Sequence, residues 1–291
     1  MLRSLMIGTL GAIAVGAGVL CIYVYKTAIK IINERADMLY IKECKQDSAG
    51  LVFHWSLDEA DGPTVGDDSG HGVTGEMGSL FENHRFFFRI PARFRAFALP
   101  KRVEGAIGKA LEFDGTNWVH AGNSRCYTTD KFTFAAWIWK KKERPAVEGD
   151  WFVPTIAAKS NWPGNGWWLC TQPNTQNLDM AISTGPTRKH IHSEWEIPAE
   201  EWHHVIVTMD NVDHEIRFYV DGKKFGSDHT DVPTWATNWD QNLFVGEYDG
   251  TGRWPWIGRI DNVYYWNTEL SEEEILGHYG REAAARAEKK L

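Results

Sequence analysis

Cysteine is scarce in this chain, with four residues among 291. That number is too low for a small domain held together by a disulfide framework. Cys21 lies in an uncharged segment, and the odd set of Cys44, Cys126 and Cys170 allows at most one internal disulfide. The chain also lacks an N-x-S/T glycosylation sequon, which disfavours a eukaryotic cell-surface glycoprotein.

An excess of basic residues is missing as well. The formal net charge is −8, whereas nucleic-acid-binding domains are typically basic, so we expect no nucleic-acid partner. The common catalytic motifs are absent too, because the sequence contains no HExxH, CxxC, Walker or GxSxG pattern. These absences together predict a protein that is not an enzyme.

Charge is absent from residues 5–25, LMIGTLGAIAVGAGVLCIYVY. An uncharged helix of this length crosses a bilayer, which predicts a single transmembrane anchor over residues 1–25. A cleaved signal peptide is the alternative, but its hydrophobic region is shorter and no small-residue cleavage site follows Tyr25. Closely spaced glycines and alanines in the segment suit packing against another membrane helix, although a generic anchor needs no such partner.

Residues 26–49 are predicted to form a juxtamembrane helix and linker, because Ile29, Ile32, Ala36 and Leu39 fall on one helical stripe. From residue 51 onward, short alternating runs are separated by Gly, Asp, Asn and Pro clusters, which predicts at least eight strands and a β-sandwich or jelly roll. The predicted strands are LVFHWSL, ALEFDG, FTFAAWIWK, WWLCT, HHVIVTMD, IRFYVDG, NLFVGEYDG and IGRIDNVYYWN.

Two local motifs predict where strands turn and where a helix begins. The Asp-Gly pair at 221–222 is typical of a tight hairpin. Ser271 followed by Glu274 forms a capping-box pattern at a helix start. The alanine-rich polar residues 281–291 are predicted to form a short C-terminal helical tail.

The order of these runs resembles the laminin-G-like domains of the concanavalin A-like lectin/glucanase superfamily. The resemblance covers about 50–280 and implies an all-β, two-sheet antiparallel jelly roll. The matching segments are HWSLDEADG, DDSGHGVTG, GKALEFDG, FTFAAWIWK, WHHVIVTMD, IRFYVDGK, LFVGE and WIGRIDNVYYWNTELSEEEI. The glucanases of this superfamily carry a strand of the form E-x-D-x-x-E, whose acids lie on one face. The nearest pair here, Glu194 and Glu196, has no third acid in register.

The resemblance also implies a structural calcium ion that ties the start of the domain to its last strand. Asp261 occupies the C-terminal ligand position, and Asp58 with Gly62 lies in the N-terminal segment; Asp68 is a further candidate. Calcium prefers carboxylate and carbonyl oxygens. The alternative is that these aspartates only accept hydrogen bonds from turn amides.

Tryptophan is abundant, with 15 residues, and several lie in or beside predicted loops. Aromatic rings stack on sugars and are also enriched at protein interfaces. Neighbours Trp167 and Trp168 must point to opposite faces of a strand, so one is expected in the core and the other against solvent, a ligand or a partner. Core packing is the alternative for about half of the tryptophans. The predicted ligand- or partner-binding tryptophans are Trp162, Trp168, Trp239 and Trp254.

An insertion at 79–102 departs from the pattern of the superfamily. It is rich in phenylalanine and in basic residues and has no acid after Glu82. Such a loop suits docking on a protein partner or an anionic membrane, and a flap over the domain's own sheet is the alternative. The predicted contact residues are Phe86, Phe87, Phe88, Arg89, Arg93 and Arg95.

The pair His203–His204 in WHHVIVT first suggests a metal or catalytic site. Successive residues of a strand face opposite ways, so the two rings cannot both bind one ion. We therefore expect one histidine near the core and one facing out.

These features favour a non-catalytic accessory subunit of a larger membrane complex, respiratory, photosynthetic or similar, whose partners are other membrane subunits. A membrane-anchored lectin or adhesin that binds a glycan is the alternative. The resemblance implies an extracytoplasmic jelly roll, in the periplasm, at the cell surface or in an intermembrane space. The excess of lysine and arginine after residue 25 predicts the opposite orientation.

Overall fold

The computed structural model describes residues 45–79, 99–141, 153–160, 165–172, 175–184, 187–226, 228–229 and 241–289. The predicted anchor at 1–25, residues 26–44 of the predicted juxtamembrane segment and most of the insertion lie outside these residues. Within the described part of the chain, no helix is both long enough and apolar enough to span a membrane.

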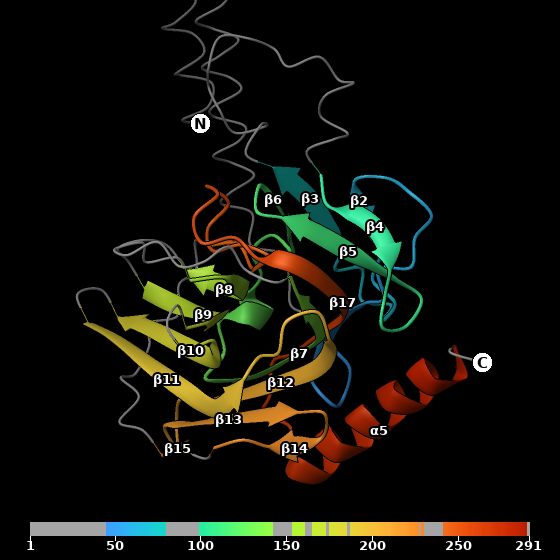
Figure 1. Cartoon of the computed structure of the whole chain (residues 1–291). Coiled ribbons are helices and arrows are strands. Elements are labelled where there is room, and N and C mark those ends of the chain that lie inside the picture. Colours follow the sequence, from blue (N-terminus) through green and yellow to red (C-terminus); the bar gives the residue numbers. More distant parts are fainter. Residues whose placement is uncertain are drawn as a thin grey trace, which may run out of the picture. The chain divides into compact units, whose positions relative to one another are not determined.

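One layer of the fold is a nine-stranded antiparallel sheet (Figure 1). Its central strands β7 and β17 pair with each other, and both are buried along most of their length. Strand β1 (Leu51–Trp55) pairs with β17, and β15 (Asp228–His229) pairs with β13. The main path of the sheet runs, in order, through β14 (Lys223–Lys224), β13 (Glu215–Val220), β12 (Trp202–Asp210), β7 (Lys131–Lys140), β17 (Ile257–Trp266), β5 (Lys109–Asp114) and β4 (Lys101–Glu104).

The second layer is an eight-stranded antiparallel sheet. Its strands are, in sheet order, β11 (Thr187–Glu196), β10 (Asn177–Thr184), β9 (Asn165–Thr171), β8 (Thr155–Ser160), β16 (Phe244–Val245), β6 (Asn117–His120), β3 (Gly75–Ser79) and β2 (Thr64–Val65). A short 3-10 helix, η2 (Arg125–Tyr127), follows β6.

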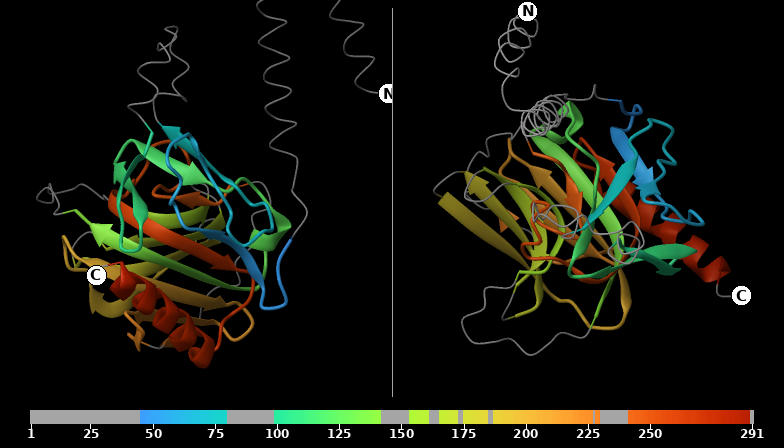
Figure 2. Two further views of the ribbon diagram at one scale, coloured as in Figure 1. Left: turned by 90° about the vertical axis from the view of Figure 1, so that its right-hand side faces the viewer. Right: turned by 90° about the horizontal axis from the view of Figure 1, so that it is seen from above.

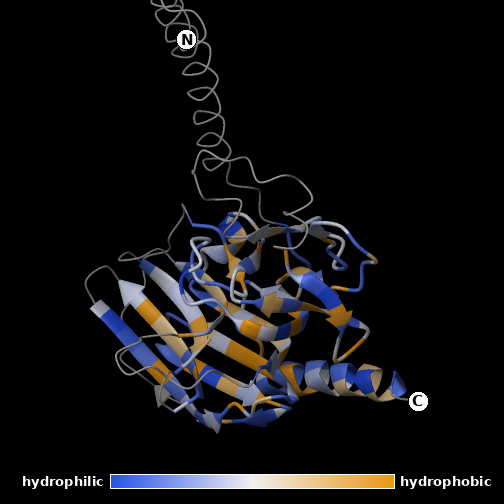
Figure 3. Cartoon of the chain, turned by 45° about the horizontal axis from the view of Figure 1, so that its top comes forward, coloured by the Kyte–Doolittle hydropathy of each residue, from blue (hydrophilic) through white to orange (hydrophobic). Residues whose placement is uncertain are grey.

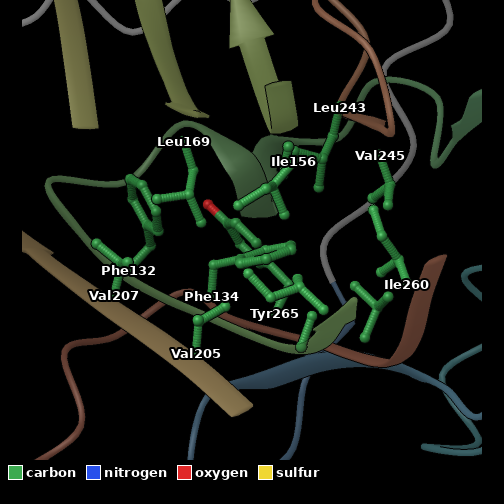
Figure 4. Packing of buried hydrophobic residues seen from close by; sticks show 14 of the residues in the cluster. Phe132, Phe134, Ile156, Leu169, Val205, Val207, Leu243, Val245, Ile260 and Tyr265 are labelled. Carbon is green, nitrogen blue, oxygen red and sulfur yellow. The ribbon is translucent and has the colours of Figure 1, made fainter. Parts of the chain in front are cut away.

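The main core fills the space between the two sheets, where alternate side chains of facing strands meet (Figure 4). Phe132 and Phe134 of β7, Val205 of β12 and Tyr265 of β17 come from one sheet, and Leu169 of β9 comes from the other. Figure 3 shows apolar segments along strands of both sheets. The predicted fold class, an antiparallel two-sheet sandwich, is confirmed.

The turn at 221–222 is the predicted tight hairpin between β13 and β14. Asp221 and Gly222 both have positive φ, 47° and 73°, as a two-residue hairpin turn of this type requires. A Cβ at Gly222 would also lie only 2.5 Å from the Tyr279 ring, so this turn also allows close approach of the C-terminal helix.

The last element that the structure describes is the helix α5 (Glu272–Glu288). Both hydrogen bonds of the predicted capping box are present between Ser271 and Glu274. The helix continues through residue 280, so the predicted boundary between the jelly roll and a separate tail at 281 divides one continuous element. Glycine often ends a helix, but Gly277 and Gly280 both lie within α5, so the glycines do not mark its end.

Helix α5 packs on the outer face of the nine-stranded sheet (Figures 1 and 2). Ile275 is fully buried with Ile206 of β12 and Trp266 of β17. Further along, Glu282 accepts hydrogen bonds from Trp137 Nε1 at 3.0 Å and from Tyr264 Oη at 2.7 Å. Because most residues of α5 are hydrophilic (Figure 3), a few apolar and polar contacts dock it.

Candidate functional site

The outer face of the eight-stranded sheet carries a group of interacting polar and aromatic side chains. Alternation along β9 sends Trp167 and Leu169 into the core between the sheets and turns Trp168 and Cys170 to the outer face. Strand register then places Ala181 of β10 beside Trp168. The small Ala181 side chain leaves room for the larger groups on the flanking strands.

Asp179 of β10, the strand next to the edge strand β11, is fully buried on this face. Its two carboxylate oxygens face two histidines of β11, His190 Nδ1 at 2.7 Å and His192 Nδ1 at 2.6 Å. Cys170 Sγ lies 3.4 Å from the same carboxylate. The cross-strand pairing of Asp179 with His192 and Cys170 creates this cluster.

The protonation of the cluster follows from these contacts. Burial alone would raise the pKa of Asp179, but hydrogen bonds from His190 and His192 lower the pKa below its usual value. The hydrogen bond to Asp179 in turn raises the pKa of His192, whose side chain is half exposed. Burial raises the pKa of Cys170 well above its usual value, so this thiol is not a nucleophile at neutral pH.

Trp168 is the centre of an aromatic cluster on the same face. Its ring stacks with Trp254 at 6.2 Å, meets the Tyr248 ring edge-on at 5.2 Å and lies under the Arg188 guanidinium at 5.3 Å. Trp168 is 0% exposed. The outward-facing tryptophan, expected to meet solvent, a ligand or a partner, therefore does not reach solvent. The outward side chain is covered by a second, smaller core, and only Trp254 remains partly exposed.

Glu247 holds the loop that carries Tyr248 and Trp254. Its buried carboxylate accepts hydrogen bonds from the backbone amides of Asp249 at 2.9 Å, Gly252 at 2.8 Å, Arg253 at 2.7 Å and Gly250. Burial raises the pKa of Glu247 to about 7 despite these amides. The carboxylate therefore has a structural role in shaping the loop.

The predicted calcium ligands Asp58 and Asp261 lie on two sides of the turn at 105–109. Asp261 accepts a hydrogen bond from Ile107 N at 2.9 Å, and Asp58 accepts one from Lys109 N at 2.6 Å. Burial, followed by the charge of Asp58, raises the pKa of Asp261 to about 8. Both carboxylates thus bond turn amides, which is the alternative that the sequence left open.

The fit of this pair to calcium is partial. Asp261 is fully buried, and among the described residues no cation pairs with it. Gly62 is exposed and no atom approaches its Cβ position within 4 Å. No group of three or more His, Cys, Asp or Glu side chains is arranged for a metal in the part of the chain described here. A cation would therefore need Asp58, Asp261 and backbone carbonyls of the 105–109 turn.

The two histidines of WHHVIVT lie on opposite faces, as expected. His203 Nδ1, near the start of β12, pairs at 2.7 Å with Asp221 of the turn that follows β13. His204 faces outward but is completely buried against His278 and Tyr279 of α5, so the side chain expected to face out is covered by the helix. Burial, together with the nearby His278, lowers the pKa of His204 well below its usual value. The pair therefore serves the fold.

A family model described as the concanavalin A-like lectin/glucanases superfamily (Laminin_G_3) matches residues 113–276, more than half of the chain. The chain belongs to this superfamily. No curated protein matched significantly.

Solved structures of this superfamily's fold resemble the chain at low sequence identity. The fourth domain of an extracellular arabinanase from Geobacillus stearothermophilus, solved with arabinotriose, has a TM-score of 0.55 and 18% identity, with 79% of this chain and 98% of that domain covered. The binding domain of Paraclostridial Mosquitocidal Protein 1 has a TM-score of 0.56 and 16% identity, with 79% of this chain and 52% of that chain covered.

The binding domain of botulinum neurotoxin DC, solved with rat synaptotagmin II, has a TM-score of 0.54 and 12% identity, with 80% of this chain and 52% of that chain covered. This chain therefore spans about half the length of the two toxin binding domains. At these identities the likeness establishes the fold alone.

Several predicted contact residues of this superfamily member lie outside the described residues, so the structure places none of them. They are Phe86, Phe87, Phe88, Arg89, Arg93, Arg95, Trp162 and Trp239. The last residues of the insertion are described, and Arg102 pairs with Glu59 at 2.6 Å and donates to Leu57 O at 3.2 Å. This end of the insertion is thereby attached to the segment that follows β1.

Sequence reasoning missed the cluster of Asp179, His190 and His192. One signal was present, because the pattern His-Ile-His at 190–192 places both histidines on one face of a strand. The partner Asp179 could not be identified, since the register between β10 and β11 decides which acid lies opposite them.

Proposed function

We propose that this chain is a non-catalytic recognition module that acts as an accessory subunit of a larger membrane complex, respiratory, photosynthetic or similar. The supporting observation is the state of the buried acids in the eight-stranded layer. Asp179 is engaged by two imidazoles, and Glu247 by four backbone amides. A glycosidase needs two carboxylates facing the substrate, and neither of these two is free for that role.

In this proposal, residues 5–25 anchor the chain in the bilayer and the insertion at 79–102 contacts neighbouring subunits. The jelly roll is extracytoplasmic in this proposal. A structural calcium between Asp58 and Asp261 is part of the proposal. It would bind the ionised form of both side chains and join the N-terminal segment to β17.

Glycan binding is the second candidate function. It is favoured by Trp254, which is partly exposed and lies beside the Arg253 guanidinium at 6.0 Å. The related arabinanase domain was solved with a trisaccharide, and sugar rings stack on tryptophan faces. In this form of the function, Trp254 is the contact residue and buried Trp168 supports it from below.

Purification of the tagged full-length chain from its native membrane in mild detergent tests the first proposal. Mass spectrometry is expected to find other membrane subunits in stoichiometric amounts. Replacing Phe86, Phe87 and Phe88 with serine keeps the length of the insertion and is expected to release these partners. A matched Trp254→Ala variant is expected to retain them.

The same preparations separate the two functions. If the wild type is monomeric and binds a glycan array, and if Trp254→Ala abolishes that binding, the accessory-subunit proposal is wrong and the lectin is correct. Partners that remain bound to the triple serine variant would reject the insertion as the docking segment.

A further inference from the structure

A pocket of about 490 Å³ opens between the β4–β5 turn, the start of β12 and the end of α5. The pocket is lined by Arg259 of β17, Arg286 of α5, the C-cap residue Lys289, Trp202 of β12 and Glu104 of β4, together with the 105–108 turn. This volume suits a small organic ligand. The pocket lies on the opposite sheet from the Asp179 cluster, so it is a separate feature.

Two of the cations are held in place by stacking on tryptophans. The Arg259 guanidinium lies 4.7 Å from the ring centre of Trp139, and the Arg286 guanidinium lies 4.7 Å from that of Trp137. Trp137 and Trp139 are two residues apart on β7 and therefore share one face of the sheet. A guanidinium stacked in this way keeps its plane fixed and presents its N–H edge to a ligand.

The charges around the pocket are unbalanced, with three cationic side chains and one carboxylate in the lining. Arg259 pairs with Glu112 at 3.4 Å, and Lys289 pairs with Asp58 at a long 3.7 Å. Arg286 donates to Trp202 O at 3.5 Å. Its Nε is buried and has no hydrogen-bond partner among the described residues, so an acceptor entering the pocket would satisfy it.

We propose that this pocket binds a phosphoryl group, with Arg259, Arg286 and Lys289 as its donors. Two planar guanidinium groups and an ammonium match the charge and the several acceptor oxygens of a phosphate dianion. The half-buried Trp202 forms a wall for the organic part of a phosphate ester. Arg286 and Lys289 lie beyond residues 113–276, so the end of α5 and its C-cap residue, both outside the family match, supply two of the three cations.

Thermal unfolding of the full-length protein in mild detergent tests this proposal, with sodium phosphate compared with sodium chloride at equal ionic strength. Phosphate is expected to raise the unfolding midpoint with saturation. Arg286→Gln and Arg259→Gln are each expected to weaken the apparent affinity about tenfold or more, as loss of a charged hydrogen bond predicts. Arg281→Gln removes the same charge from an exposed position of the same helix and is expected to change nothing.

A second titration with dihexanoylphosphatidic acid identifies the source of the phosphoryl group. Tighter binding of this ester than of inorganic phosphate indicates a lipid headgroup, and equal affinity indicates free phosphate. The absence of a saturable response to both compounds overturns the proposal. A response that is undiminished in Arg259→Gln, which leaves α5 intact, overturns it as well.

Discussion

The outer faces of the two sheets are covered by different groups. On the nine-stranded sheet, helix α5 covers the outer face with Ile275 and a buried Glu282 that accepts hydrogen bonds from Trp137 and Tyr264. On the eight-stranded sheet, Asp179 is buried but is held by histidines of the strand β11, one of which is half exposed.

The two outer faces therefore differ in how far their buried groups can respond to solvent and pH. A face covered by the chain's own helix is stabilised mainly by packing, and its histidine, His204, is buried with the pKa lowered. A face whose buried carboxylate is reached by partly exposed histidines remains in contact with solvent and responds to pH. Substitutions on the two faces should therefore have different effects.

The largest effect is expected from Trp168→Ala on the eight-stranded face. Removing a fully buried indole should lower the free energy of unfolding by about 4 kcal/mol, because the cavity cannot be filled by its neighbours. Trp254→Ala, at the partly exposed edge of the same cluster, should cost about 1 kcal/mol or less. Urea denaturation measures both, and equal losses would show that Trp254 is as much a core residue as Trp168.

Asp179→Ala should cost about 3 kcal/mol at neutral pH, because it leaves two histidines without their carboxylate. Glu194→Ala, which removes an exposed acid from the neighbouring strand β11, should have little effect. The difference between the two variants in the free energy of unfolding, measured by chemical denaturation, gives the contribution of the buried carboxylate.

Asp179 and His192 make the free energy of unfolding depend on pH in opposite directions. Because the pKa of Asp179 is lowered, its contribution is present above the usual aspartate pKa of 3.8 and is lost as the pH falls through the folded value. Because the pKa of His192 is raised, its contribution is present below 6.5 and is lost as the pH rises through its folded value. A flat difference between wild type and Asp179→Ala from pH 3 to pH 9 would contradict the contacts described for this cluster.

On the nine-stranded face, Ile275→Ala should cost about 2 to 3 kcal/mol, since its side chain is fully buried under the helix. The neighbouring Leu276 is 46% exposed, and Leu276→Ala should change the free energy of unfolding by about 0.5 kcal/mol or less. Thermal or urea unfolding of these adjacent variants tests whether α5 is docked. Similar small effects at both positions would mean that it is not.

A smaller effect, about 1 kcal/mol, is expected from calcium. With a pKa of about 8, Asp261 favours the folded state fully below pH 3.8, and this contribution is lost as the pH rises towards 8. Calcium should pair with the ionised form, so its stabilisation should grow with pH and disappear in Asp261→Ala. A wild-type melting temperature that is unaffected by calcium at pH 8 would reject the site.

Much of the nine-stranded sheet was predictable from sequence. β7, β12 and β17 carry long apolar runs bounded by turn residues, and the hairpin at 221–222 and the capping box at Ser271 depend on contacts only a few residues apart. β16 is shorter than its predicted run, because Glu247 turns the residues after Val245 into a loop.

The docking of α5 and the arrangement of the outer faces were not predictable. The residues that α5 buries are Ile275, His278 and Glu282, two of them polar, so hydropathy does not mark the contact face. Trp168, Tyr248 and Trp254 meet only because β9 and a distant loop come together in the fold. Such contacts depend on strand register and tertiary packing, which a single sequence does not specify.

The mass of the detergent-solubilised particle that contains this chain tests the central claim most directly. Native mass spectrometry is expected to find the 33.1 kDa chain only within a larger assembly with other membrane subunits, and to find it alone after Phe86, Phe87 and Phe88 are replaced by serine. A wild-type particle that holds a single copy of the chain and binds a glycan through Trp254 would contradict the account.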